Sequence, residues 1–404
     1  MKRLYKEDGL AKKTIRDIEV EGKRVLVRVD FNVPLDINSG AISDDSRIRA
    51  VLPTIQYLVE HKAKVILCSH LGRPDGKIVE ALRIAPIARR LSQLINLTVA
   101  IAPDCIGTEV ESEVNELKPG SILLLENLRF HPEEEENDPA FAQSLAMLAD
   151  IYVDDAFGTA HRAHASTVGV AKYLPAVAGF LMEKELTALG GILSSPEHPF
   201  VALLGGAKVS DKIGLIQNIL DKVDKLLIGG GMAATFLRAL GYSIGSSLIE
   251  TDKQDLAREL VDTAKRKNVT LKLPLDVVVA DAIKKEATGQ VVAVSDIPDN
   301  KGIVDIGPRT VEMFTREIAI CRTVFWNGPM GVYEIEQFAA GTKAIAKLLA
   351  SLKATTIVGG GSTAEIVDEM HLASKMSHVS TGGGASLKFL EGKTLPGVAV
   401  LLDK

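Results

Sequence analysis

The residues best suited to chemistry follow the apolar runs in the first half of the chain. Four such runs, at 24–29, 64–68, 121–125 and 150–154, each end just before polar side chains. Ligands of open parallel sheets bind outside the carboxyl ends of the strands, so we expect these side chains to meet at one edge. Several guanidinium groups gathered together need an anion, which predicts a pocket for a small, heavily anionic molecule. The candidate residues are Asp30, Asn32, Arg47, His70, Arg73, Asn127, Arg129, His161, Arg162 and His164.

Two other interpretations of these residues remain open. Any single arginine of the set, taken alone, is better explained as a surface residue on an unrelated loop. His161 and His164 are three residues apart and could ligate a metal, but no cysteine or third histidine stands near them in sequence. We therefore interpret the two histidines as structural.

The second half of the chain follows its apolar runs with glycines. Triplets stand at Gly229–Gly231, Gly359–Gly361 and Gly382–Gly384, and a glycine pair precedes Lys208 and Lys212. A glycine-rich turn that enters a helix offers free N–H groups and the positive end of the helix dipole to phosphate oxygens. The pattern predicts that a phosphate chain lies beside Gly359–Gly361.

Two of these turns also satisfy a looser dinucleotide-binding pattern, which makes a nicotinamide-dependent dehydrogenase the alternative function. The matches lie at 229–234 and 359–364. A dinucleotide site wants an acidic residue at the end of the next strand, about 20 residues on, and Glu250 does not follow a clear strand. The single-loop phosphate pattern is absent too, because Leu387 stands where its first glycine belongs.

Apolar runs and segments of helical spacing alternate from about residue 25 to the end of the chain. Near-continuous apolar strands are covered on both faces, so the sheets should be largely parallel, in two doubly wound α/β domains. We expect the domains to span 1–180 and 181–392, joined within a helical segment that runs from Phe180 to Leu189. In the second domain, strands are predicted at 200–204, 225–228, 274–280, 323–326, 355–358 and 377–380.

The acidic run Glu133–Glu136 precedes Asp138 and Pro139, which have the types expected at the cap and first position of a helix. We interpret the run as a solvated loop before that helix.

Composition excludes several classes of protein. The 404 residues carry a net charge of −5, whereas nucleic acids and anionic membranes attract a basic face, so neither is expected as a partner. The three cysteines, Cys68, Cys105 and Cys321, have no disulfide or metal spacing, which is typical of a reducing compartment. The first residues lack the apolar core of a signal peptide. We expect a soluble, cytoplasmic protein.

The motifs together resemble those of the phosphoglycerate kinase family from about Thr14 to the end of the chain. The matching strings are RVDFNVP, SHLGRP, LLENLRFHPEEE, DAFGTAHRAHAST, GGAKVSDK, GGGMA, WNGPMGV and STGGGASL. The resemblance implies reversible phosphoryl transfer between 1,3-bisphosphoglycerate and ADP, giving 3-phosphoglycerate and ATP, by a monomeric glycolytic enzyme. It implies Rossmann-like domains joined by a hinge helix, with the phosphoglycerate on the first, Mg²⁺-ATP or Mg²⁺-ADP on the second, and residues 393–404 returning to the first.

The resemblance also implies roles for individual residues. The substrate-binding residues that the resemblance implies are Asp30, Phe31, Asn32, Arg47, His70, Leu71, Gly72, Arg73, Arg129 and Arg162. Its nucleotide-binding residues are Gly206, Lys208, Lys212, Gly230, Gly231, Asn327, Pro329, Glu334, Gly359, Gly360, Gly361, Ser362 and Thr363. Its catalytic residues are Arg47, Lys208, Lys212, Gly361 and Gly384.

This chemistry agrees with what the motifs contain. The acceptor carboxylate is ionised at neutral pH, so no general base is required, and phosphoryl transfer is mostly alignment and charge neutralisation. One position departs from the family, because Ser362 stands where the resemblance implies an acidic residue near the magnesium. A hydroxyl is a poorer magnesium ligand than a carboxylate, and we assign no metal ligands from the sequence.

Overall fold

A computed structural model describes residues 11–36 and 39–404, which divide into two compact units. Unit 1 comprises the chain up to Thr187 together with Thr394–Lys404, and unit 2 comprises Ala188–Lys393. The chain passes from one to the other within helix α6, Phe180–Ser194. The first ten residues, where the sequence predicts no signal peptide, lie outside the described part of the chain.

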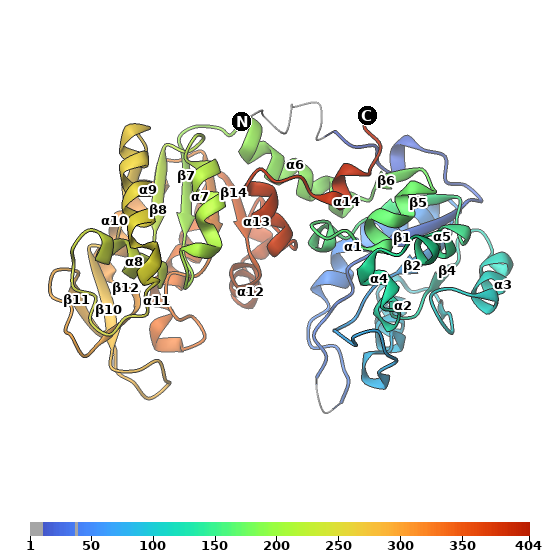
Figure 1. The fold of residues 1–404 in the computed structure, drawn as a ribbon, viewed down its shortest axis with the longest axis horizontal. Helices are drawn as coiled ribbons and strands as arrows, with labels where there is room; N and C mark the ends of the chain where they lie inside the picture. The colour runs from blue at the N-terminus through green and yellow to red at the C-terminus, as the bar shows by residue number, and fades with distance from the viewer. Residues whose placement is uncertain (1–10, 37–38) are drawn as a thin grey trace. The chain divides into compact units, whose positions relative to one another are not determined.

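Unit 1 is built on a six-stranded parallel sheet with the order β3-β4-β2-β1-β5-β6 (Figure 1). Its central strands are buried on both faces, which is why they are near-continuous apolar runs. The strands are β1 Arg24–Arg28, β2 Lys64–Cys68, β3 Val99–Ile101, β4 Ile122–Leu124, β5 Ile151–Asp154 and β6 Ala176–Ala178. The helices are α1 Ser46–Glu60, α2 Ala85–Ile95, α3 Thr108–Glu116, α4 Glu133–Glu136, α5 Pro139–Met147 and α14 Pro396–Ala399.

Helix α1 shows how the sequence positions these elements. Its buried side chains Ile48, Val51, Ile55 and Leu58 recur at three and four residues, so one face of the helix packs into the core. Arg47 stands at the second residue of the helix, close to the carboxyl ends of the strands.

Unit 2 repeats the plan with a second six-stranded parallel sheet, in the order β15-β14-β13-β7-β8-β9. Its strands are β7 Phe200–Leu204, β8 Lys225–Ile228, β9 Thr270–Lys272, β13 Thr323–Asn327, β14 Thr355–Gly359 and β15 His378–Val379. Its helices, apart from α6, are α7 Ile213–Ile219, α8 Met232–Ala239, α9 Gln254–Arg266, α10 Pro308–Ala319, α11 Ala340–Ser351, α12 Gly361–Glu369 and α13 Gly384–Leu390. The two parallel sheets confirm the predicted α/β class.

One sheet was not expected from the sequence. The run at 274–280 was predicted as a strand of the parallel sheet, but β10, Asp276–Ala280, is the centre of a separate antiparallel sheet. Its partners are β11, Gln290–Ala293, and β12, Gly302–Ile306. An apolar run specifies a buried strand without specifying which neighbour it pairs with, so the error lies in the pairing.

The interpretation of Glu133–Glu136 as a solvated loop was wrong. These residues form helix α4, and the Glu134 side chain is fully buried. The next helix begins as predicted, because the Asp138 side chain accepts a hydrogen bond from the Phe141 amide and Pro139 is the first helical residue.

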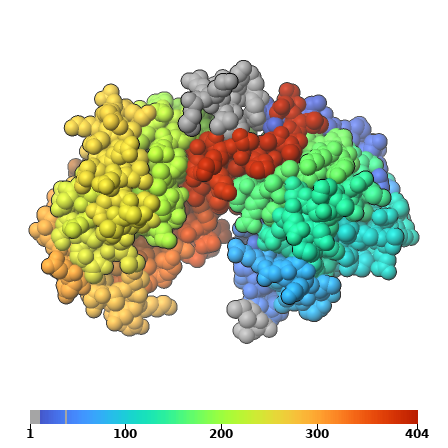
Figure 2. All heavy atoms as spheres, in the orientation of Figure 1, coloured from blue at the N-terminus to red at the C-terminus, as the bar shows by residue number. Residues whose placement is uncertain are grey.

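The end of the chain packs on unit 1, as Figure 2 shows in red. The Gly397 amide donates to the Ala160 carbonyl at 2.9 Å, and the Leu402 amide donates to the Ala176 carbonyl at 2.9 Å. No helix within the described residues is long and apolar enough to cross a membrane.

A buried carboxylate joins the antiparallel sheet of unit 2 to a helix. Helix α10 has Gly307 at its cap position, which offers no side chain to its first amides. Asp276, on β10, supplies the acceptors instead and takes hydrogen bonds from the Arg309 amide at 3.1 Å and the Thr310 amide at 2.8 Å. The cap is therefore provided by a residue more than thirty positions earlier in the chain.

We predict that Asp276→Ala destabilises unit 2 by about 2 kcal/mol, because buried amides lose their acceptors. For a unit of this size the melting midpoint should fall by roughly 4–8 °C, measurable by calorimetry. The matched control is Asp281→Ala, which removes an exposed carboxylate just after the same strand. Equal midpoints for the two variants would contradict the prediction.

Candidate active site

The loops that carry the predicted substrate residues are locked to one another. Strands β4, β2, β1 and β5 are neighbours in the sheet, so their carboxyl ends lie side by side. The Gly72 amide donates to Asn32 Oδ1 at 2.8 Å, and the Leu71 amide donates to Asn127 Oδ1 at 3.1 Å. These bonds tie the loop after β2 to the loops after β1 and β4. The three loops are thus held in fixed positions relative to one another at this edge of the sheet.

His70 lies at the centre of a group of arginines. The guanidinium of Arg28 can only donate, so its contact of 3.1 Å from Nη2 to His70 Nδ1 leaves that nitrogen as the acceptor. The imidazole proton is then on Nε2. Burial holds the pKa of His70 well below its usual value, and nearby guanidinium groups lower it further. His70 is therefore neutral at pH 7 and offers an N–H. The arginines that act on it are Arg28, Arg129, Arg47 and Arg162.

Arg28 is a residue of this site that the sequence reasoning missed. It is 1% exposed, and its Nε donates to Ser166 Oγ at 2.9 Å. Ser166 in turn donates to the buried carboxylate of Glu134 through Oγ at 2.6 Å and its amide at 2.9 Å. Burial raises the pKa of Glu134, while Arg28 and the bonds from Ser166 lower it. The available signal was an arginine directly after three apolar residues of the strand, because a buried charge needs partners.

Arg129 presents an unsatisfied donor. It follows β4 in the turn Leu128–Phe130, and its side chain is 6% exposed. Its Nη1 donates to the Gly72 carbonyl at 2.8 Å and its Nη2 pairs with Glu135 at 2.9 Å. The buried Nε has no hydrogen-bond partner among the described residues. A buried unpaired donor on a cation is a place for an anion to bind.

The remaining predicted substrate residues differ in how they can take part. Arg47 Nη1 pairs with Asp30 Oδ2 at 2.5 Å, so the two residues form one charged unit beside the strand ends. Arg73 is exposed. Phe31 and Leu71 are buried in the hydrophobic core, which leaves only their main-chain groups to face a ligand.

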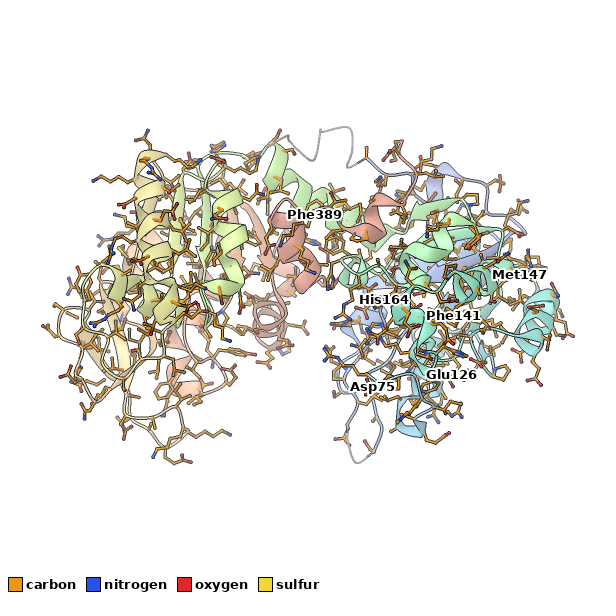
Figure 3. The ribbon with its side chains drawn as sticks, in the orientation of Figure 1. Asp75, Glu126, Phe141, Met147, His164 and Phe389 are labelled. Atoms are coloured by element: carbon orange, nitrogen blue, oxygen red, sulfur yellow. The ribbon has the colours of Figure 1, made fainter. Side chains whose placement is uncertain are left out.

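The two histidines that the sequence suggested as a possible metal pair lie in different surroundings. His164, labelled in Figure 3, is buried, and burial with nearby arginines lowers its pKa to about 4. His161 lies against Arg162, whose Nε is 3.4 Å from its Nε2. Neither belongs to a potential metal-binding group within the described part of the chain.

In unit 2 five neighbouring strands, β15, β14, β13, β7 and β8, end in glycine-rich turns. Asn327, the last residue of β13, accepts a hydrogen bond from Lys212 Nζ through Oδ1. Its buried Nδ2 has no partner among the described residues. The neighbouring Gly328 amide donates to Thr363 Oγ1 at 2.7 Å, which fixes the start of helix α12 against β13.

The glycines of these turns serve two distinct purposes. A Cβ on Gly230 would lie 2.6 Å from the amide nitrogen of Gly206, so this glycine is required by the close approach of two main chains. Gly360, at the cap of helix α12, has φ +92°, which favours glycine. A Cβ on Gly361 would meet no atom within 4 Å. Within the triplet Gly359–Gly361, it is therefore Gly361 that faces open space where a ligand can approach.

The two predicted lysines differ in environment. Lys208 is exposed in the turn after β7. Lys212 is 8% exposed, and burial lowers its pKa from 10.5 to about 8. Of the other nucleotide candidates, Glu334 and Ser362 are exposed, and the Pro329 carbonyl accepts from the Gly206 amide at 2.8 Å.

Comparison with known proteins identifies the family of this chain. The family model for phosphoglycerate kinase matches residues 15–393. The chain belongs to the phosphoglycerate kinase family. It is 58% identical to the phosphoglycerate kinase of Moorella thermoacetica over 395 residues, covering 98% of this chain and 100% of the relative. The phosphoglycerate kinase of Pelotomaculum thermopropionicum is also 58% identical with the same coverage.

Solved structures of the family have the same fold. The phosphoglycerate kinase of Coxiella burnetii superimposes with a TM-score of 0.88 at 45% identity, covering 96% of this chain and 98% of the other. That of Pyrococcus horikoshii gives a TM-score of 0.81 at 34% identity with the same coverage.

Family membership confirms the predicted activity and removes the dehydrogenase alternative. The protein is a glycolytic phosphotransferase with a carboxyl group as acceptor, and it interconverts 1,3-bisphosphoglycerate and ADP with 3-phosphoglycerate and ATP. Phosphoglycerate kinases use a magnesium-bound nucleotide.

We predict that kcat/KM for ADP falls as pH rises through about 8, where Lys212 loses its positive charge. Because an arginine keeps its charge to much higher pH, Lys212→Arg should move this limb upward. Lys222→Arg, past the far end of helix α7 and just before β8, serves as the matched control. Steady-state rates across the pH range measure the effect, and a wild-type profile that stays flat through pH 8 would exclude it.

Proposed function

We propose that unit 1 binds the phosphoglycerate and that unit 2 binds the magnesium nucleotide. The observation that carries this assignment is the contrast between the two sheet edges. Unit 1 collects guanidinium groups around a neutral histidine, whereas unit 2 collects main-chain amides and two lysines. The first set suits a compact anion, and the second suits a phosphate chain that lies along several turns.

Within unit 1, the phosphate of 3-phosphoglycerate is held by His70, Arg73, Arg129 and Arg162. The free Nε of Arg129 and the Nε2–H of His70 support this role, because both are donors. Asp30 and Asn32 hold the hydroxyl and carboxylate side. The main chain of Phe31, Leu71 and Gly72 completes the pocket.

Within unit 2, Lys208 and Lys212 neutralise the nucleotide phosphates. Gly359–Thr363 cap the phosphate chain, where the open position at Gly361 supports a close approach of ligand oxygen to the main chain. The orphaned Nδ2 of Asn327 supports a ligand acceptor at the end of β13. Gly206, Gly230, Gly231 and Pro329 shape the nucleotide pocket, and Glu334 contacts the ribose.

In the direction of ATP formation, a terminal oxygen of ADP attacks the acyl phosphorus. The bond from phosphorus to the carboxyl oxygen breaks, and the carboxylate leaves with the bonding electrons. No proton has to move, since the leaving carboxylate is stable as an anion at neutral pH. The catalytic residues Arg47, Lys208, Lys212, Gly361 and Gly384 then act by neutralising charge on the transferring group.

The magnesium ion is held mainly by nucleotide oxygens and water. The turn from Gly359 to Thr363 offers hydroxyls and main-chain groups but no carboxylate, and Thr363 Oγ1 already accepts from the Gly328 amide. Ser362 is exposed at the second residue of helix α12, so it can contact a hydrated ion. When bound, the metal neutralises charge on the phosphates.

One chain suffices for the reaction under this proposal, because both ligand sets belong to the same polypeptide. The protein then acts as a monomer on small molecules, with no nucleic acid or membrane partner. Its three buried free cysteines support a reducing cytoplasmic setting.

We predict that Arg47→Ala and Lys208→Ala each lower kcat by roughly 10²-fold or more, with a smaller change in KM. The loss reflects charge stabilisation that develops in the transition state. A coupled assay of ATP formation from 1,3-bisphosphoglycerate measures it. Arg49→Ala, on the same helix as Arg47, and Lys265→Ala, on the exposed face of α9, are the controls. Near-normal turnover in either test variant would remove that residue from the catalytic set.

We predict that Ser362→Asp tightens the apparent affinity for magnesium in the presence of ADP, because a carboxylate is a better ligand than a hydroxyl. Activity titrated with magnesium gives the half-saturating concentration. Ser351→Asp, which adds the same charge at an exposed position at the end of α11, controls for long-range electrostatics. Identical titrations for wild type and Ser362→Asp would show that this side chain does not reach the ion.

A further inference from the structure

Unit 1 brings together three potential metal ligands that have no part in the proposed substrate site. Asp104 and Cys105 follow strand β3, and His131 follows the turn after β4. Strands β3 and β4 pair in parallel, and the Glu126 amide donates to the Asp104 carbonyl at 3.3 Å, which joins the two loops. Since Asp104 and His131 are 27 positions apart in the chain, sequence spacing gives no sign of this group.

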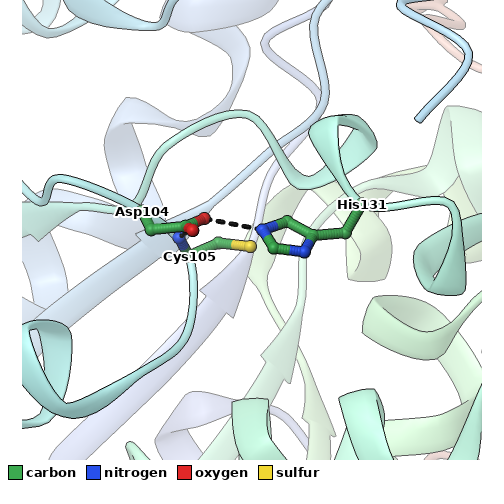
Figure 4. A group of neighbouring side chains, drawn as sticks. All are labelled: Asp104, Cys105 and His131. Carbon is green, nitrogen blue, oxygen red and sulfur yellow. Dashed lines mark hydrogen bonds and ion pairs between the residues drawn. The ribbon is translucent and has the colours of Figure 1, made fainter. Parts of the chain in front are cut away.

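The three side chains converge on one point, as Figure 4 shows. Asp104 Oδ1 lies 2.7 Å from His131 Nε2. One ligand atom from each of Asp104, Cys105 and His131 lies within 4.8 Å of the others. In a tetrahedral zinc site such atoms are about 3.4–3.6 Å apart, so side-chain movements of about an ångström suffice. This is the one group of its kind within the described residues.

The burial of the three residues suits a site with an open side. Cys105 is fully buried, whereas the side chains of His131 and Asp104 are 26% and 46% exposed. The thiol therefore forms the floor, and the carboxylate and imidazole form a solvent-facing rim. An ion can enter past the rim, and water can supply a fourth ligand.

The donor types select the class of ion. Sulfur, imidazole nitrogen and carboxylate oxygen together are a zinc-type set, whereas magnesium and calcium prefer oxygen alone. We propose that Asp104, Cys105 and His131 form a binding site for a thiophilic divalent cation, with Zn²⁺ as the expected ion. This site is separate from the magnesium of the nucleotide.

A simple ion pair between the carboxylate and the imidazole does not account for the thiol. Another pair of the same kind, His198 with Asp224 at 2.6 Å, lies in unit 2 and belongs to no such group. At the proposed site the thiol adds a soft ligand beside the pair. Burial and Asp104 raise the pKa of Cys105, so the thiol is protonated in the free protein. Metal binding therefore displaces protons, and the affinity should weaken in acid.

Cobalt(II) is the probe that distinguishes this site from a surface carboxylate, because a cobalt–thiolate bond gives a charge-transfer absorption band in the near ultraviolet. We expect the nucleotide-free, full-length protein to bind one equivalent of Co²⁺ with this band and Zn²⁺ to displace it. Cys105→Ser should abolish the band. His131→Gln should weaken Zn²⁺ affinity, measured by competition with a chromophoric chelator, by about tenfold or more.

Two matched variants control for the other thiols and the other ion pair. Cys321→Ser changes another buried free cysteine, and His198→Gln changes the other histidine–aspartate pair, so both should bind Co²⁺ and Zn²⁺ like wild type. His131→Gln alters a partly exposed side chain and keeps the test informative should Cys105→Ser fail to fold. The proposal is overturned if wild type shows no thiolate band, if the band survives in Cys105→Ser, or if His131→Gln binds Zn²⁺ as tightly as wild type.

Discussion

The edge of unit 1 that we propose binds the substrate depends on the buried cation Arg28. Arg28 is the last residue of strand β1 and is fully buried, and a buried charge is unfavourable unless it is paired. Ser166 Oγ accepts a hydrogen bond from Arg28 Nε and donates one to the carboxylate of Glu134. Arg28 Nη2 donates to His70 Nδ1. The chain of contacts sets the proton of His70 on Nε2 and keeps the ring neutral. A neutral ring among arginines donates a hydrogen bond without adding to their mutual repulsion.

Unit 2 meets the same demand for positive potential by different means. Its turns supply main-chain amides and the amino ends of helices, whose geometry is fixed by close contact between glycines such as Gly206 and Gly230. Side-chain cations suit a small ligand whose charges are close together. Main-chain amides suit a longer ligand, because they line a path across several strands without side-chain entropy to lose. The difference matches the shapes of the two ligands proposed for these units, a phosphoglycerate and a nucleotide.

The parallel sheets explain why both edges exist. Every strand of such a sheet runs in the same direction, so residues far apart in sequence reach one edge after their strands end. The same rule accounts for the Asp104, Cys105 and His131 group, since β3 and β4 are also parallel neighbours. Chemistry at this edge is therefore not confined to the substrate residues, and a second kind of ligand can use the loops at its far end.

The sequence by itself determined the α/β class, most strands, the helix start at Asp138 and the family, because apolar periodicity and linear motifs are local properties of the chain. The roles of individual site residues and the limits of the ligand-binding domains stay predictions. Tertiary structure alone decided that β10 pairs in an antiparallel sheet, that Glu134 is a buried partner of Ser166, and that Asp276 caps a distant helix. It also decided that Arg28 orients His70. Each of these depends on contacts between segments distant in sequence, and neither composition nor spacing records which buried groups will meet.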